Sequence, residues 1–353
     1  YKYTAELRRQ NHDKGGTSGA LNNLGNALTQ KSDYAEALDV FRQALEIKSE
    51  LEDQKGMAGI YNNMGTIYLK TGNYAEALTY YQKSLEVREK LEDEKGISAC
   101  YNNIGLVHWT QGNFELAIDY YKKSLPFMQK ANDLYNVSNC LNNLGSVYYD
   151  MGEYEKALDY YKEAMKIRKE TGSKYGIATS QSGMGKAFLK KEMYDSAASY
   201  FNKALLLSEE IGNARLNAAL NNNMAITFFN KKNYDTALEY CEKAHKIAKE
   251  IGAKKEIWET ADLLSQIHAQ LDDFHKAYHF SKIFANYGDS LLNEENSQII
   301  NGLEIKYQAK KRKLELNQKN AEIQRNKAEL KSNRILRNFL ILCIILFIVT
   351  VLL

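Results

Sequence analysis

The chain has 353 residues, of which 44% are apolar and 26% are charged, a composition that is ordinary for a globular protein with a sizeable core. The net charge is +3, but residues 294–337 carry 11 Lys or Arg against 6 Asp or Glu, so the rest of the chain is slightly acidic. A slightly acidic body argues against nucleic acid as a partner, and a single Pro among many Ala, Leu, Lys and Glu predicts an all-α fold.

A pattern with a period of 40 residues runs from the start of the chain to about residue 293. Four kinds of residue stand at fixed positions in it. They are an Asn pair (Asn22-Asn23, Asn62-Asn63, Asn102-Asn103, Asn142-Asn143 and Asn222-Asn223), a Gly (Gly25, Gly65, Gly105, Gly145 and Gly185), an aromatic residue (Tyr34, Tyr74, Phe114, Tyr154, Tyr194, Tyr234 and Phe274) and an Ala (Ala37, Ala77, Ala117, Ala157, Ala197, Ala237 and Ala277). Repetition of this kind is typical of a solenoid.

Each unit has the pattern of two helices joined by short turns. In the second unit, Ile60, Met64 and Ile67 form one apolar face at helical spacing, and a second face that includes Tyr81 follows the break at 71–73. Such short turns predict antiparallel helices. A Gly inside a helix costs about 1 kcal/mol relative to Ala, so its recurrence indicates a close contact where no side chain fits. The recurring Ala would be its small counterpart.

These residues follow the pattern NxGxxYxxxGxYxxAL, which resembles the tetratricopeptide repeat. The resemblance covers residues 1 to about 292 and implies a right-handed α-solenoid in which the first-helix Gly packs against the second-helix Ala. Residues 1–14 align with the end of a truncated unit, and residues 15–293 with seven units. The period is longer than the commoner one of about 34 residues, as in many signalling members of the family. With no initiator Met at the start, we expect a piece of a longer protein.

Some positions depart from the pattern. Ser182 and Gly183 replace the Asn pair in the fifth unit, and Asp262 and Leu263 replace it in the seventh. Ala225 and Ser265 stand where earlier units have Gly. Pro126 falls within a second helix, so we expect a local irregularity in the third unit.

The Asn pairs are the candidate binding residues. Asn is a poor helix former, and in resembling proteins this face of the first helix lines a concave groove and holds peptides. A primary amide carries two donors and an acceptor, so a ladder of amides could pair with the backbone of an extended peptide. The alternative is structural: one Asn of each pair could bridge neighbouring units and meet no ligand. Peptide or protein is therefore the expected partner, and both roles stay open for each Asn.

No enzyme chemistry is expected in this piece, and no cofactor. Residues 183–187 look like a phosphate loop only superficially, because they lie in the helical register, Ser180 stands where the first Gly should be, and Ala187 replaces the Ser or Thr. His268, His275 and His279 could hold a metal, but His268 stands at an aromatic core position and the other two at surface positions. The four Cys form no CxxC motif and read as core thiols.

Residues 294–334 form a charged segment that predicts a long helical stalk. Ile300, Leu303 and Tyr307 fit a heptad pattern, and later apolar residues recur every seven positions in a shifted register. The stalk could pair as a coiled coil and so support a homodimer, or it could stay a single solvated helix.

Residues 335–353 are apolar except for two residues near the start of the run, and they predict a transmembrane helix. The bilayer would then be a second partner. The basic residues before the run place the repeats in the cytoplasm by the positive-inside rule. The arrangement also resembles bacterial membrane-bound sensors, typical of Bacteroidetes, through Leu303 to Tyr307 and the basic run 310–313. That resemblance implies a single-pass inner-membrane protein with periplasmic repeats.

Two functions follow from this arrangement. The first is the sensory input region of a signal-transduction receptor, with a histidine kinase or helix-turn-helix output beyond residue 353. The second is a membrane-anchored scaffold or assembly factor without an output domain.

Overall fold

The computed structural model describes residues 1–289 and, beyond them, residues 318, 319, 323, 324, 327 and 331. The predicted stalk over 294–334, apart from these six residues, and the predicted transmembrane helix over 335–353 lie outside the described residues. The chain divides into two compact units, Tyr1–Ile299 and Ile300–Leu353. Among the described residues, no helix is both long enough and apolar enough to cross a bilayer.

Residues 1–289 form α-helices and turns without a strand, which confirms the predicted fold class. The helices are α1 (Lys2–Gln10), α2 (Lys14–Gln30), α3 (Tyr34–Glu50), α4 (Gln54–Lys70), α5 (Tyr74–Lys90), α6 (Glu94–Thr110), α7 (Phe114–Lys130), α8 (Leu134–Asp150), α9 (Tyr154–Glu170), α10 (Lys174–Lys190), α11 (Tyr194–Glu210), α12 (Ala214–Asn230), α13 (Tyr234–Glu250), α14 (Lys254–Gln270) and a further helix over 274–289. From α2 onward they pair into seven antiparallel hairpins, each with a first and a second helix. The predicted repeat of two helices every 40 residues is therefore confirmed.

The turns between helices explain the regular spacing. The middle residue of every turn has a positive φ, for example +66° at Ser32 and +70° at Gly72. After α2, the N–H of Asp33 donates to the carbonyl of Leu28 and the N–H of Ser32 to that of Thr29, which is the Schellman arrangement. Asp33 is also the first residue outside α3. The same residue therefore caps the end of one helix and precedes the first residue of the next. Each helix from α2 to α14 has 17 residues.

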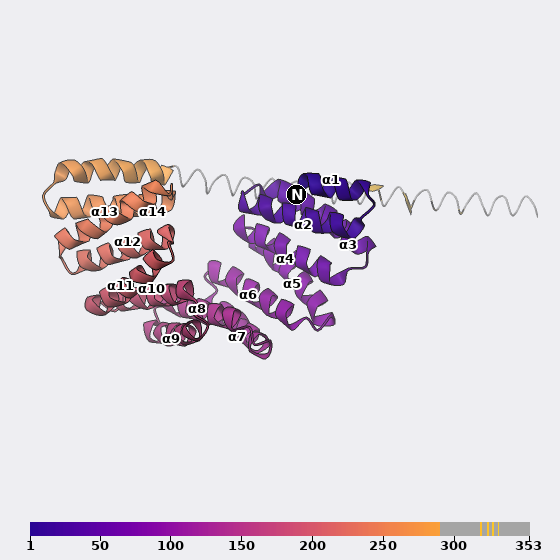
Figure 1. Cartoon of the computed structure of the whole chain (residues 1–353), viewed down its shortest axis with the longest axis horizontal. Helices are drawn as coiled ribbons and strands as arrows, with labels where there is room; N and C mark the ends of the chain where they lie inside the picture. Colours follow the sequence, from indigo (N-terminus) through magenta and orange to yellow (C-terminus); the bar gives the residue numbers. More distant parts are fainter. Residues whose placement is uncertain (290–317, 320–322, 325–326, 328–330, 332–353) are drawn as a thin grey trace, which may run out of the picture. The chain divides into compact units, whose positions relative to one another are not determined.

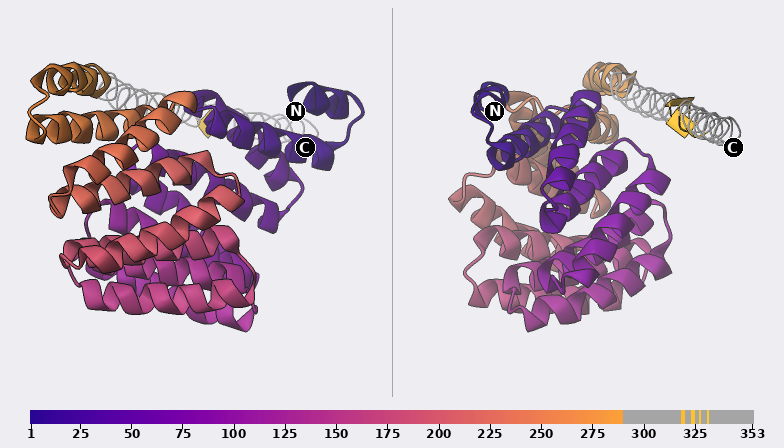
Figure 2. Two further views of the ribbon diagram at one scale, coloured as in Figure 1. Left: turned by 60° about the vertical axis from the view of Figure 1, so that its left-hand side comes forward. Right: turned by 90° about the vertical axis from the view of Figure 1, so that its right-hand side faces the viewer.

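The hairpins stack in chain order along the repeat region (Figures 1 and 2). Each helix packs on its two neighbours in sequence, and first helices of several neighbouring units also touch, as α8 does with α10 and α12 with α14. Among α1–α14, no two second helices make comparable contact. The first helices therefore lie on the inner side of the stack. We call the surface formed by their side chains that point away from the second helices the inner face.

The recurring Gly packs under an aromatic ring as well as against the recurring Ala, which was the only counterpart expected from the sequence. A Cβ built on Gly185 would lie 2.5 Å from the ring of Phe201, and one built on Gly65 would lie 2.8 Å from the ring of Tyr81. Each ring belongs to the second helix of the same hairpin, four residues after the recurring Ala. The Ala contributes its backbone: the carbonyl oxygen of Ala157 would be 3.2 Å from a Cβ on Gly145.

The two units without this Gly also lack the ring. In the sixth unit Ala225 replaces Gly and Cys241 takes the ring position, and both are fully buried. In the seventh unit Ser265 replaces Gly and Ser281 takes the ring position. Ser265 Oγ then donates to the carbonyl of Ala277 at 2.9 Å. The exchange at both positions together shows that the Gly makes room for the ring.

Pro126 does not interrupt its helix, contrary to the irregularity predicted for the third unit. α7 spans Phe114–Lys130 with Pro126 inside it and has the same length as the other second helices. Pro126 removes one intrahelical donor, as a Pro does at any interior position of a helix. The contacts of the neighbouring α6 and α8 hold the remaining turn in the helical register.

A second column of contacts joins the two helices of the second to seventh hairpins through stacked rings. The pairs are Tyr68–Tyr80, His108–Tyr120, Tyr148–Tyr160, Phe188–Tyr200, Phe228–Tyr240 and His268–Phe280, with ring centroids 5.2–5.7 Å apart. His268 is 1% exposed in this column, which confirms the core position predicted for it. Among the described residues, no group of three or more His, Cys, Asp or Glu is placed to hold a metal ion.

Three histidines that are buried or half-buried predict a loss of stability in mild acid. Burial lowers the pKa of His108, His245 and His268, although Asp273 lies 3.7 Å from His268. Unfolded histidines, with a pKa of about 6.5, therefore take up protons first as the pH falls. Stability should be complete above this value and should decrease as the pH drops toward 5.

The measurement is the urea midpoint of unfolding between pH 7.5 and 5. His108→Tyr and His268→Phe place the aromatic residues of other units at these positions, and together they should flatten the pH dependence. The matched control is His275→Gln, because His275 is exposed. An unchanged pH profile in the double variant would contradict the assignment.

Candidate binding groove

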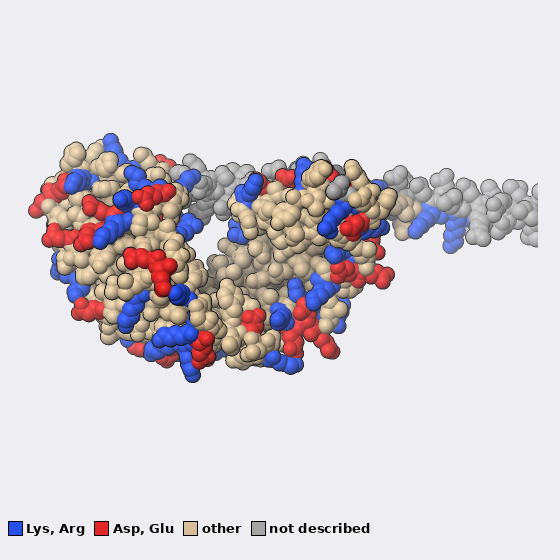
Figure 3. Space-filling model, viewed as in Figure 1, with Lys and Arg blue, Asp and Glu red and all other residues tan. Residues whose placement is uncertain are grey.

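In the view of Figure 3, Lys and Arg side chains are interspersed with Asp and Glu over the surface of the repeats, without a large region of one sign. Two neighbouring pockets open on the first helices of the fourth to seventh units.

The Asn pairs connect neighbouring units in the first part of the repeat region. Asn63 Nδ2 donates to Asn22 Oδ1 at 3.0 Å, and Asn103 Nδ2 donates to Asn62 Oδ1 at 2.8 Å. The second Asn of one unit is thus the donor to the first Asn of the unit before it. The bridging role, one of the two roles left open by the sequence, is present at these junctions. Binding of a ligand by the Asn amides stays a prediction.

A buried Arg replaces this bond at the junction of the fourth and fifth units, where Gly183 offers no donor. Arg168, 5% exposed at the end of α9, reaches Asn142 Oδ1 at 2.9 Å and Asn139 Oδ1 at 2.8 Å. It also donates to Ser180 Oγ at 2.7 Å. Both Asn amides therefore direct their carbonyl oxygens toward the guanidinium. Their N–H groups are left to serve as donors on the other side.

The Arg168 side chain reaches the Asn residues because the Asp that would pair with it, at the cap of the next first helix, is missing. At the same position in earlier units, Lys48 and Arg88 form ion pairs with the Asp that caps the next first helix, at 2.6 and 2.7 Å. The corresponding capping residue after Arg168 is Ser173. Among the described residues no carboxylate forms an ion pair with Arg168, and burial lowers the pKa of its guanidinium.

The first pocket, which we call the α8–α10 pocket, is a cavity of about 360 Å³. Its lining includes Trp109, Asn142, Tyr149, Asp150, Thr179, Ser182, Gly183 and Lys186. Trp109 Nε1 donates to Asp150 Oδ2 at 2.7 Å, which fixes the carboxylate. The small residues Ser182 and Gly183 leave the space that an Asn pair fills elsewhere.

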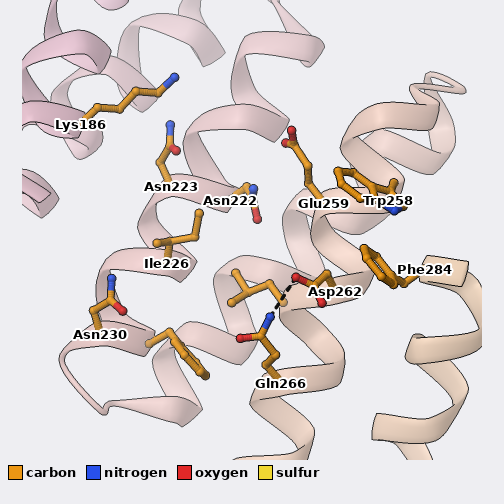
Figure 4. Close-up of a pocket in the computed structure, with 12 residues that line it drawn as sticks. Lys186, Asn222, Asn223, Ile226, Asn230, Trp258, Glu259, Asp262, Gln266 and Phe284 are labelled. Carbon is orange, nitrogen blue, oxygen red and sulfur yellow. Dashed lines mark hydrogen bonds between the residues drawn. The ribbon is translucent and has the colours of Figure 1, made fainter. Parts of the chain in front are cut away.

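The second pocket, which we call the α12–α14 pocket, is larger, about 530 Å³ (Figure 4). Its lining includes Lys186, Asn222, Asn223, Ile226, Phe229, Trp258, Glu259, Asp262, Gln266 and Phe284. Trp258 and Phe284 stack with ring centroids 5.1 Å apart and form an aromatic wall. Gln266 Nε2 donates to Asp262 Oδ2 at 2.9 Å.

Lys186 lines both pockets, and its side chain is exposed. Among the described residues it forms no ion pair and no side-chain hydrogen bond. Figure 4 shows its amino group extending from α10 toward Asn223 on α12. The junction of the two pockets therefore carries an unpaired cation beside an amide.

Three of the Asn residues predicted from the sequence line these pockets, namely Asn142, Asn222 and Asn223. Sequence reasoning missed Arg168, Lys186, Trp258 and Glu259. Comparing the residues that the seven units have at each position of the repeat would have found two of them. Lys186 is the only charged residue in its column, where the others are Asn26, Thr66, Leu106, Ser146, Ile226 and Gln266. Glu259 is likewise the only charged residue in a column of Gly19, Gly59, Ala99, Asn139, Thr179 and Ala219.

Two further expectations are confirmed. Residues 183–187 lie inside α10, so the resemblance to a phosphate loop has no structural basis. Cys100, Cys140 and Cys241 are buried free thiols, and burial raises the pKa of Cys140 to about 12. Cys343 lies outside the described residues.

Comparison with known proteins agrees with this architecture. Family models of the tetratricopeptide repeat match residues 19–51, 56–130, 136–210 and 216–280, which together make up more than half of the chain. No curated protein matches the chain.

Several solved structures have a similar fold. One is a Signal Transduction ATPase with Numerous Domains (STAND) protein with a tetratricopeptide repeat sensor from Pyrococcus horikoshii, with 21% identity, a TM-score of 0.66 and 83% of this chain covered. The match spans only 45% of that protein. The apo quorum sensor NprR from B. thuringiensis has 17% identity and a TM-score of 0.65, and 80% of each chain is covered. A Rap conjugation gene regulator in complex with the Phr* peptide has 14% identity and a TM-score of 0.54, with 81% of this chain and 77% of that one covered.

Proposed function

Because the chain belongs to the tetratricopeptide repeat family, we propose that the inner face of its repeats binds a peptide or an extended segment of a protein. The observation that carries this proposal is the pair of adjoining pockets that share the unpaired Lys186. Together they form an open groove across α8, α10, α12 and α14 that is lined by amides, aromatic rings and a free cation. An extended peptide presents the carbonyls, N–H groups and side chains that such a lining can pair with.

The donors in the α8–α10 pocket favour an acceptor from the ligand. Arg168 holds the carbonyl oxygen of Asn142, which lines the pocket, so the ligand meets the N–H groups of this amide. Lys186 adds a positive charge at the far side of the same pocket. A carboxylate of the ligand, from its C-terminus or from an Asp or Glu side chain, would form charge-assisted bonds there.

We further propose that the repeats are the sensory input region of a membrane-anchored signalling receptor. Support comes from the similar fold of a STAND protein with a tetratricopeptide repeat sensor and of the quorum sensor NprR. The predicted span over 335–353 supplies the anchor. The alternative is a membrane-anchored scaffold, and the encoding gene beyond codon 353 separates the two: an output domain supports the receptor, and a prompt stop supports the scaffold.

The groove is tested by reversing its unpaired charge. Peptides selected from a random library on the unaltered chain should bind Lys186→Glu at least about tenfold more weakly, because a charge-assisted contact is lost and a repulsive one replaces it. Fluorescence anisotropy with the selected peptides measures the change.

The control is Lys166→Glu on α9, which makes the same charge change at an exposed position outside both pockets. Its affinity for the same peptides should equal that of the unaltered chain. Equal losses in the two variants would show that net charge acts rather than the groove. A library that yields no binder at all would refute the proposal.

A further inference from the structure

The seventh unit departs from the repeat at two positions that face each other. In the other six units one position of the first helix holds only Ser or Ala, and so does its counterpart on the second helix. These columns are Ser18, Ala58, Ser98, Ser138, Ala178 and Ala218, and Ala44, Ser84, Ser124, Ala164, Ala204 and Ala244. Their small size lets the two helices approach closely, as the bond from Ser84 Oγ to the carbonyl of Ala58 at 2.8 Å shows.

In the seventh unit both positions become aromatic, as Trp258 and Phe284. The two rings lie nearly parallel, with an angle of 17° between their planes. They form one wall of the α12–α14 pocket, and both remain partly exposed (Figure 4). Two matched small-to-large changes at a single contact therefore give this unit a ring surface that the other units lack.

The same unit also places two carboxylates in the pocket. Glu259 is one residue after Trp258, and Asp262 takes the position that holds the first Asn in five other units. Asp262 accepts from Gln266 with Oδ2, and among residues 1–289 its Oδ1 has no hydrogen-bond donor. Lys255 lies 3.8 Å from Glu259 but is largely exposed, so its neutralising effect is small. With Lys186, the only cation of the lining, the pocket has a net negative charge.

A third group in the pocket is an acceptor without a donor. Asn222 is 9% exposed and its Oδ1 has no hydrogen-bond partner. In earlier units the donor would come from the second Asn of the next unit, but that position is Leu263. Figure 4 shows the amide of Asn222 between α12 and α14, facing the pocket side. A buried acceptor left unpaired is destabilising, so a donor supplied by a ligand is favoured there once the amide turns.

We propose that the α12–α14 pocket binds the positively charged group of a ligand, between the carboxylates of Glu259 and Asp262 and against the Trp258–Phe284 wall. The group is a guanidinium or an ammonium, from a basic side chain or from the amino terminus of a peptide. An aromatic face attracts such a cation, and the carboxylates supply its hydrogen-bond acceptors. The inference rests on the proposed function in that the cation would belong to the peptide in the groove. The ligand would then place its carboxylate near Lys186 and its cation near Glu259.

The two Trp residues of the chain allow a test of the pocket alone, because Trp109 lines the α8–α10 pocket and Trp258 the α12–α14 pocket. The 353-residue chain is labelled with 5-fluorotryptophan, and its two ¹⁹F signals are assigned with Trp109→Phe. The probes are N-acetyl-arginine amide, its uncharged analogue N-acetyl-citrulline amide, and leucinamide with and without N-acetylation. The cationic probes should shift the Trp258 signal in a saturable way, and the uncharged ones should not.

The double variant Glu259→Gln, Asp262→Asn should weaken binding of the cationic probe at least about tenfold, because two charged acceptors are lost. Glu163→Gln on α9, exposed and outside the pocket, is the control and should bind as the unaltered chain does. A response to arginine amide alone assigns the cation to a side chain, and a response to leucinamide alone assigns it to an amino terminus. Either supports the proposal.

Equal shifts with citrulline amide, or unchanged affinity in the double variant, would overturn it. So would the absence of any shift with the cationic probes. A cationic probe that binds while the library yields no peptide would leave the cation site standing and refute only the function proposed for the groove. The two failures are therefore separable.

Discussion

Replacing Gly185 by Ala should destabilise the repeats by about 1–3 kcal/mol, the usual cost of overpacking a core. The new Cβ would lie 2.5 Å from the ring of Phe201, which is fully buried and has no free space to move into. Helix propensity acts in the opposite direction, since Ala is favoured over Gly by about 1 kcal/mol. The steric term should win because the obstacle is a rigid ring rather than the end of a flexible chain. Chemical denaturation measures the difference.

The matched control is the same substitution at Gly59, which lies inside α4 with no atom near the position of an added Cβ. Only the propensity term applies there, so Gly59→Ala should stabilise the chain by about 0.5–1 kcal/mol. The two variants should thus differ in sign. If Gly185→Ala were also stabilising, contact with the ring would not explain why Gly recurs at this position of the repeat.

The sixth unit suggests the compensating change. There Ala225 and Cys241 take the places of Gly and ring. Phe201→Cys alone should cost about 3–5 kcal/mol, as truncation of a buried aromatic residue does. In the double variant with Gly185→Ala, the added methyl group no longer meets a ring. The total cost should therefore be lower than the sum of the single costs, and the cycle of four proteins measures this coupling.

The repeat, its two helices and its turns could be predicted from the sequence because each is a local property. Apolar spacing sets the helices, and the breaks at regular distances set the turns. The sequence also indicated a close contact between helices at the Gly, but it did not indicate the aromatic ring that the Gly contacts. The contact is with a ring four residues beyond the recurring Ala, and only the joint replacement in the last two units, such as Ala225 with Cys241, reveals the pairing.

The candidate site was predictable only in part, because its main features depend on residues that are far apart in sequence. The orientation of the Asn142 amide is set by Arg168, and the path of Arg168 depends in turn on Ser173 and Gly183. None of these residues is unusual in a helix or at a helix end, so none is conspicuous in the sequence. The Asn pairs drew attention because they recur, whereas the pockets lie where the recurrence fails. In a repeat protein the exceptions to the pattern are therefore better guides to a specific ligand than the pattern itself.

Arg168→Met should have a large effect on stability, about 2–4 kcal/mol. Met is the residue that the third unit has at this position, as Met128, so the volume and the helix are kept. The loss comes from acceptors that lose their donor: the carbonyls of Asn139 and Asn142 and the hydroxyl of Ser180. Part of it is offset because a buried cation without a carboxylate is itself costly.

The control is Arg88→Met at the same position two units earlier. Arg88 donates to Asp93 and Ser84, and its side chain is also mostly buried, so its loss should cost stability as well, about 1–3 kcal/mol. Peptide binding provides the second measurement. Arg168 does not line either pocket, yet without it the Asn142 amide can turn its carbonyl toward the ligand. Selected peptides should therefore bind Arg168→Met several-fold more weakly and Arg88→Met unchanged. If Arg168→Met lost stability but kept full affinity, the guanidinium would hold the helices together without orienting the donors of the groove.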